Sequence, residues 1–150
     1  MEIIINVIVG IGTGIISSYL VTMYWQNKLD EKQYYIEAEY DIQSICRHAD
    51  RVILELEGIV FAKERGIDIR TLIRVADDIP IAKLKLNEKG QEEIGRLRHL
   101  IFEVSDLAKV GKLDGNTAVK YRADITREEL KILREKQEYI IPFKSKVYLA

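Results

Sequence analysis

The chain has 150 residues, of which 47% are hydrophobic and 31% charged, and its formal net charge is −1. This balance is typical of a folded globular chain and excludes an intrinsically disordered one. A nearly neutral chain also lacks the excess of Lys and Arg with which proteins bind nucleic acid nonspecifically.

The charges are distributed unevenly along the sequence. Residues 1–25 contain one charged side chain, Glu2, and all 23 Lys and Arg follow residue 25. Residues 26–78 carry 8 basic and 12 acidic side chains, a net charge of −4, whereas residues 109–150 carry 10 basic and 6 acidic, a net charge of +4. Opposite charge at the two ends suits antiparallel docking of the first and last helices. The only cysteine, Cys46, excludes an intrachain disulfide and is compatible with a reducing, cytoplasmic location.

An apolar run without ionisable acids or bases, IIINVIVGIGTGIISSYLVTMYW, covers residues 3–25. As a helix rising ~1.5 Å per residue it spans roughly 34 Å, and the hydrocarbon core of a bilayer is about 30 Å thick. Tyr24 and Trp25 close the run with the amphipathic rings that settle at a lipid–water interface. We therefore predict a transmembrane helix over residues 3–25.

Three alternatives compete with the transmembrane helix. A cleaved signal peptide requires a basic start and a cleavage site of small residues, and neither is present. Residues 7–12 resemble the opening of a dinucleotide-binding fingerprint, but Ile15 stands where that motif requires Gly or Ala. A buried core helix is the third alternative, and 23 uncharged residues are many for one.

The flanking charges predict the orientation of this helix. No Lys or Arg precedes it, whereas Lys28 and Lys32 follow it closely. Basic residues favour the cytoplasmic side of a membrane. We expect a single-pass protein of the cell membrane whose C-terminal domain is cytoplasmic.

Small or polar residues recur every fourth position in the run, and this spacing places them on one helix face. The predicted packing face consists of Asn6, Gly10, Gly14, Ser18 and Thr22. Small side chains let two transmembrane backbones approach closely. The pattern predicts a homo-oligomer, or binding to another membrane protein, through the span, although such residues are also common in ordinary transmembrane helices.

A long helix with a heptad-like seam is predicted over residues 26–65, with a possible break at 26–30. Its apolar residues alternate spacings of three and four: Tyr35, Ala38, Ile42, Ile45, Ala49, Val52, Leu56 and Ile59. The seam fits a parallel coiled coil between chains or the central helix of a bundle within one chain. The bundle is favoured because later segments offer faces that can bury it.

Three further helices and one extended segment are predicted in residues 66–150. A short helix over 69–77 follows the candidate cap Asp68, and residues 81–86 alternate weakly enough to be extended. Asn87 caps a helix over 88–110, whose apolar face comprises Ile94, Leu97, Ile101, Val104 and Leu107. The last helix covers 117–139 and is followed by a basic, aromatic tail.

A possible restart inside the last helix is indicated by Thr126 and Glu129, which match a capping box. The expected fold is all-α, one transmembrane helix followed by a three- or four-helix bundle with a long first helix.

No catalytic, cofactor-binding or metal-binding residue is predicted. The histidines are His48 and His99. His99 shares a helix face with Glu103 and Asp106, but no motif of a metalloprotease or a di-iron bundle is present.

Residues 61–75 resemble a helix-turn-helix, in which Arg70 and Arg74 are the candidate nucleic-acid contacts. Against this interpretation, the chain is neutral, and a small residue four before Gly66 also fits an ordinary helix C-cap.

The sequence thus predicts a membrane-anchored, non-enzymatic interaction or scaffold module with an unidentified cytoplasmic partner. The alternatives are a membrane-tethered DNA-binding regulator and a small membrane-acting effector that oligomerises through its span.

Overall fold

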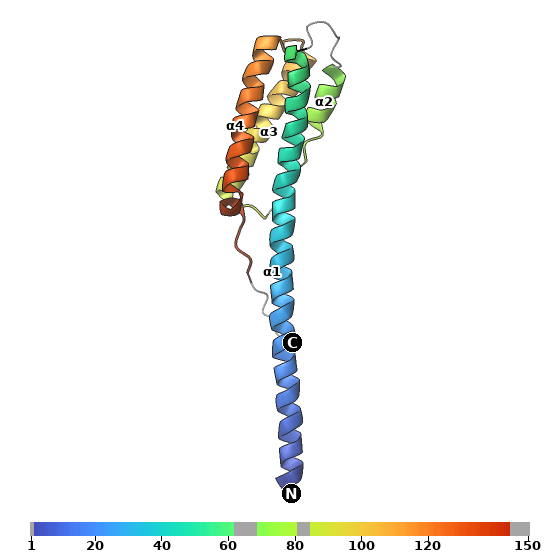
Figure 1. Cartoon of the computed structure of the whole chain (residues 1–150), viewed down its shortest axis with the longest axis vertical. Helices are drawn as coiled ribbons and strands as arrows, with labels where there is room; N and C mark the ends of the chain where they lie inside the picture. The colour runs from blue at the N-terminus through green and yellow to red at the C-terminus, as the bar shows by residue number, and fades with distance from the viewer. Residues whose placement is uncertain (1, 62–68, 81–84, 145–150) are drawn as a thin grey trace. The chain divides into compact units, whose positions relative to one another are not determined.

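The computed structural model describes residues 2–61, 69–80 and 85–144; the side chains of residues 1–8 also lie outside the description. It contains four helices, α1 (Glu2–Phe61), α2 (Ile69–Asp77), α3 (Glu88–Lys109) and α4 (Gly115–Tyr139) (Figure 1). In the same residues the only β-type pairing is an isolated antiparallel bridge between Leu86 and Ile140. The prediction of an all-α chain with a helical bundle is confirmed.

The chain divides into two compact units. One is Glu37–Ile141, and the other joins Met1–Ile36 to Pro142–Ala150. Helix α1 contributes to both.

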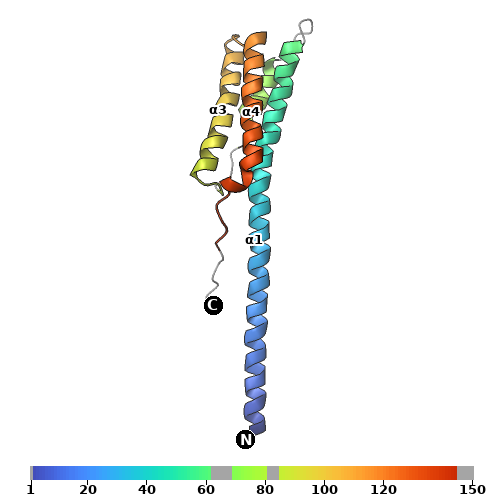
Figure 2. The ribbon, with the colours of Figure 1, turned by 60° about the vertical axis from the view of Figure 1, so that its left-hand side comes forward.

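The larger unit, Glu37–Ile141, is a four-helix bundle. Figure 2 shows α3 and α4 side by side with the C-terminal part of α1. The α1 seam is at most 1% exposed at Ala38, Ile42, Ile45, Ala49, Val52 and Leu56. Burying each large apolar side chain contributes roughly 1.5–3 kcal/mol to folding. The heptad-like seam is therefore buried within one chain at these six positions, whereas its two end residues, Tyr35 and Ile59, are half-buried.

Helices α3 and α4 complete the core with apolar faces of the same periodicity. Buried residues on α3 include Ile94, Leu97, Ile101 and Val104, and those on α4 include Ala118, Ile125, Ile132 and Tyr139. Each helix begins at a side-chain cap, because Asn87 Oδ1 accepts the Gly90 N–H at 2.8 Å and Asp114 Oδ1 accepts the Thr117 N–H at 2.7 Å.

Two expected interruptions of helices are absent from the described chain. Helix α1 runs unbroken through residues 26–30, and α4 runs unbroken from Gly115, two residues before its predicted start. The Thr126 hydroxyl donates to the Arg122 carbonyl at 2.8 Å, one turn back in the same helix. The predicted capping-box restart is therefore wrong. A threonine inside a helix bonds the preceding turn when no end of the helix requires a cap.

In the smaller unit, the segment that follows Pro142 lies against α1. The Phe143 N–H donates to the Tyr35 hydroxyl at 3.2 Å, and the rings of Phe143 and Tyr34 lie 5.5 Å apart. Of the tail predicted beyond residue 142, residues 145–150 lie outside the described chain.

No helix in the described residues is both long and apolar enough to cross a membrane. The transmembrane helix predicted at residues 3–25 is therefore unsupported by the structure. The side chains of residues 1–8, which include the first six of that segment, lie outside the description.

Candidate functional site

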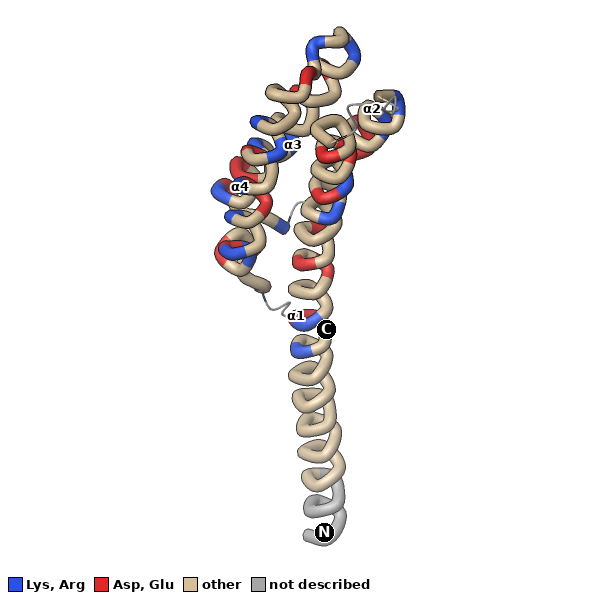
Figure 3. Tube along the Cα trace, turned by 45° about the horizontal axis from the view of Figure 1, so that its top comes forward, with Lys and Arg blue, Asp and Glu red and all other residues tan. Residues whose placement is uncertain are grey.

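The first candidate site is the apolar stretch of α1 from Val9 to Trp25. Its large side chains are 46–65% exposed at Val9, Ile11, Ile15, Ile16, Tyr19, Leu20, Val21, Tyr24 and Trp25. Figure 3 shows that no Lys, Arg, Asp or Glu interrupts this stretch. The exposed apolar residues lie on all sides of the helix, whereas a surface helix of a water-soluble domain has one apolar face. A helix that is apolar all round requires an apolar environment or a partner.

Two glycines of the predicted packing face have open space beside them. A Cβ added at Gly10 or Gly14 would meet no atom within 4 Å. The Thr22 hydroxyl already donates to the Ser18 carbonyl at 2.8 Å, so that across a helix contact it can only accept. Asn6, the remaining member of the predicted packing face, has its side chain outside the described residues.

The second candidate site is a carboxyl pair where α1 and α4 pack together in the bundle. Glu129 of α4 is 6% exposed and faces Asp50 of α1 in an open cavity of about 310 Å³. Desolvation raises the pKa of Glu129 to about 7, and the negative charge of Asp50 and a hydrogen bond to its side chain add to this effect. Near neutral pH the Glu129 carboxyl is therefore only partly ionised.

Cys46 lines the same cavity as the carboxyl pair. Burial raises the pKa of its thiol to about 12, helped by the negative charges of Glu129 and Asp50. The thiol stays protonated at physiological pH, and the protonated form is not a nucleophile. The sequence analysis did not predict this cluster of Cys46, Asp50 and Glu129, because the sequence pattern does not indicate which residue of α4 meets Asp50.

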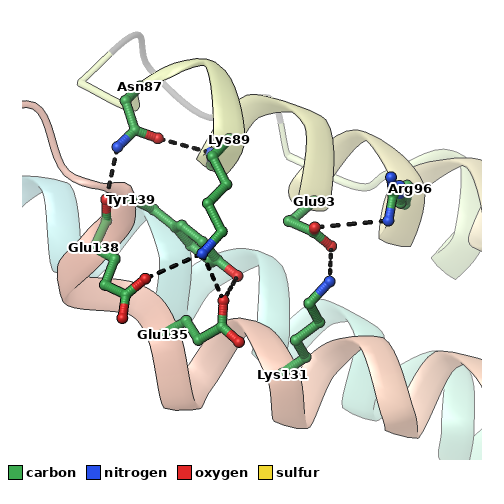
Figure 4. Close-up of polar contacts among 9 residues, drawn as sticks. Asn87, Lys89, Glu93, Arg96, Lys131, Glu135, Glu138 and Tyr139 are labelled. Carbon is green, nitrogen blue, oxygen red and sulfur yellow. Dashed lines mark hydrogen bonds and ion pairs between the residues drawn. The ribbon is translucent and has the colours of Figure 1, made fainter.

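A set of ion pairs joins α3 to α4 (Figure 4). The ammonium of Lys89 lies 3.0 Å from a carboxylate oxygen of Glu135, and the ammonium of Lys131 lies 2.7 Å from Glu93. Arg96 lies 3.6 Å from the same Glu93 carboxylate, which is only 6% exposed. These pairs place two positive charges beside the buried Glu93 carboxylate and link α3 to α4, which is a structural role.

The two histidines serve different contacts. The His48 ring is half-buried, and its Nε2 hydrogen-bonds with the Val75 carbonyl, which joins α1 to α2. His99 is exposed and lies 3.3 Å from Glu103 one turn along α3. In the described part of the chain, no three His, Cys, Asp or Glu side chains gather closely enough to hold a metal ion.

Arg70 and Arg74, the candidate nucleic-acid contacts, are exposed on α2, whereas Leu72 and Ala76 are buried. The turn of the predicted helix-turn-helix falls in residues 62–68, outside the described chain. The structure therefore leaves the DNA-binding alternative as a prediction.

The fold and these surfaces define a class of protein, a helical bundle whose first helix carries an exposed apolar segment. No known protein family matches this chain, and no curated protein or solved structure does.

Proposed function

We propose that this protein is a membrane-anchored, non-enzymatic interaction module. Residues 3–25 cross the cell membrane once, and the bundle lies on the cytoplasmic side, where it binds a protein partner.

The observation that carries the proposal is the exposed apolar surface on every side of α1 between Val9 and Trp25. Such a surface is unfavourable in water at ~25 cal/mol per Å² and favourable in lipid. Residues 3–8 read IIINVI, so that five of these six residues are Ile or Val and extend the apolar run toward the N-terminus. With them the segment has 23 residues, within the range of roughly 17–25 that spans a bilayer.

Fractionation of membranes at alkaline pH tests the anchor. We expect the full chain to stay in the carbonate pellet and the double variant Ile15→Lys/Ile16→Lys to leave it, because each lysine at the centre of a span costs roughly 3 kcal/mol. The matched control is Leu54→Lys, since Leu54 of the bundle is 64% exposed and Ile15 is 65% exposed. Carbonate extraction of the unaltered chain would refute a spanning helix.

Trypsin tests the orientation because every Lys and Arg lies after residue 25. With the bundle in the cytoplasm, trypsin added to intact spheroplasts should leave the chain whole, and detergent permeabilisation should allow cleavage. Cleavage in intact spheroplasts would place the bundle outside.

The four-residue spacing of Gly10 and Gly14 supports a homo-oligomer formed through the span. A bulky side chain at Gly14 would keep two helices apart, so Gly14→Leu should lower a transmembrane association signal. Gly12→Leu is the control, because Gly12 lies off the predicted face and a Cβ there also meets nothing within 4 Å. Equal signals from both variants would remove the case for packing through this face.

A further inference from the structure

A mixed polar and aromatic pocket opens in the smaller unit, directly after the apolar segment ends at Trp25. It has a volume of about 260 Å³ and is lined by Tyr24, Asn27, Lys28, Glu31 and Phe143. Four of these residues come from two successive turns of α1, and Phe143 comes from the far end of the chain.

Phe143 is fixed in place by two contacts. Its N–H donates to the Tyr35 hydroxyl at 3.2 Å, and its ring packs at 5.5 Å, tilted by 56°, on that of Tyr34. Tyr24, which also lines the pocket, contacts Trp25 edge-to-face at 6.0 Å. The pocket therefore has two aromatic walls that are held by neighbouring rings.

The polar groups of the pocket are incompletely matched. Asn27 Oδ1 is buried, and no donor in the described chain reaches it. Lys28 and Glu31 form an ion pair of 3.1 Å, with side chains 54% and 39% exposed. A buried acceptor without a donor is costly, whereas an exposed ion pair contributes little and opens easily. The pocket thus requires a hydrogen-bond donor and presents one positive and one negative group.

We propose that this pocket binds the headgroup of a phospholipid carrying both a primary ammonium and a phosphodiester, the chemistry of phosphatidylethanolamine. This inference rests on the proposed function, because a span ending at Trp25 places the pocket at the depth of the headgroups. The ammonium N–H groups bond Asn27 Oδ1 and the Glu31 carboxylate, and Lys28 pairs with the phosphate. Tyr24 and Phe143 offer ring faces to the ammonium.

The orphaned oxygen of Asn27 decides between headgroups. A choline headgroup is cationic and would suit the aromatic walls, but its trimethylammonium has no N–H to donate. A glycerol headgroup can donate through its hydroxyls but supplies no cation to the Glu31 carboxylate in place of Lys28 when Lys28 pairs with the phosphate.

The test uses the full chain purified in a mild detergent and mixed with equal amounts of dioleoyl phosphatidylethanolamine and dioleoyl phosphatidylcholine. Native mass spectrometry then counts the retained lipids. We expect the ethanolamine lipid to be retained in preference by roughly tenfold, the value of one charge-assisted hydrogen bond. Asn27→Leu and Glu31→Gln should each reduce this preference toward equality.

The control is Gln26→Leu, which removes the exposed amide of the residue before Asn27 and should keep the preference for the ethanolamine lipid.

Equal retention of both lipids by the unaltered chain, or an unchanged preference in Asn27→Leu and Glu31→Gln, would overturn the assignment. Displacement by an equal concentration of soluble glycerophosphoethanolamine would assign the pocket to a free headgroup and overturn the lipid. Carbonate fractionation of the same variants separates this result from the anchor, because a chain that stays in the pellet without any lipid preference refutes the pocket alone.

Discussion

Replacing Glu129 with glutamine should make the bundle more stable at alkaline pH and remove most of the pH dependence of its unfolding. The carboxyl of Glu129 is 6% exposed and lies against Asp50. Glutamine has nearly the same shape, keeps a donor toward Asp50 and carries no charge to desolvate. The variant therefore imitates the protonated form of Glu129 at every pH.

The size of the effect follows from the pKa of Glu129, which burial and Asp50 raise from 4.5 to about 7. Each pKa unit corresponds to ~1.4 kcal/mol, so this difference is worth roughly 3 kcal/mol. Because the folded protein holds the proton more tightly than the unfolded chain, the stabilisation is complete below pH 4.5 and is lost as the pH rises through 7. The free energy of unfolding should thus fall between these two values.

The assay is unfolding of the full chain by guanidinium chloride in a nonionic detergent, followed by far-ultraviolet circular dichroism from pH 4.5 to pH 8. Glu129→Gln should match the unaltered chain at the acidic end and exceed it by up to roughly 3 kcal/mol at pH 8. Asp50→Asn should also flatten the profile, because it removes the neighbouring negative charge. Glu55→Gln removes a carboxylate from α1 outside the cavity and should leave the slope unchanged.

Two results would refute this reasoning. The first is an unaltered chain whose free energy of unfolding does not fall between pH 4.5 and pH 8. The second is a Glu129→Gln variant that keeps the original slope.

Two further predictions concern the contacts that position α3. Gly90→Ala should lower the free energy of unfolding by roughly 1–3 kcal/mol, because an added Cβ would lie 2.6 Å from the Tyr139 Cβ and 3.1 Å from its carbonyl oxygen. In the same helix an added Cβ at Gly95 meets nothing within 4 Å, so Gly95→Ala should raise the free energy of unfolding by about 0.5–1 kcal/mol. Equal changes in the free energy of unfolding for Gly90→Ala and Gly95→Ala would contradict the close approach of Gly90 to Tyr139. Asn87→Ala should cost about 1 kcal/mol through the lost cap of α3, whereas Asn116→Ala, which caps no helix, should have little effect in the same denaturant titration.

Much of the bundle could be predicted from the sequence because its signals are local. The spacing of three and four residues identified the seam later found buried at Ala38, Ile42 and Leu56. The short helix was predicted at its observed bounds, and the side chain of Asn87 marked the start of α3. These features depend on helix periodicity and on the unpaired N–H groups of the first turn, which neighbouring residues satisfy.

The sequence by itself determined where the helices lie, which face of each is apolar, and that residues 3–25 carry no charge to interrupt an apolar surface. Only the tertiary structure decided that α1 and α4 continue without interruption, that Asp50 meets Glu129, and that Phe143 reaches Tyr35. The partners in these last two contacts are 79 and 108 residues apart in the chain. Periodicity fixes the face of a helix on which a residue lies, but the register between packed helices decides which residue it meets, and that register is set by the packing of the whole core.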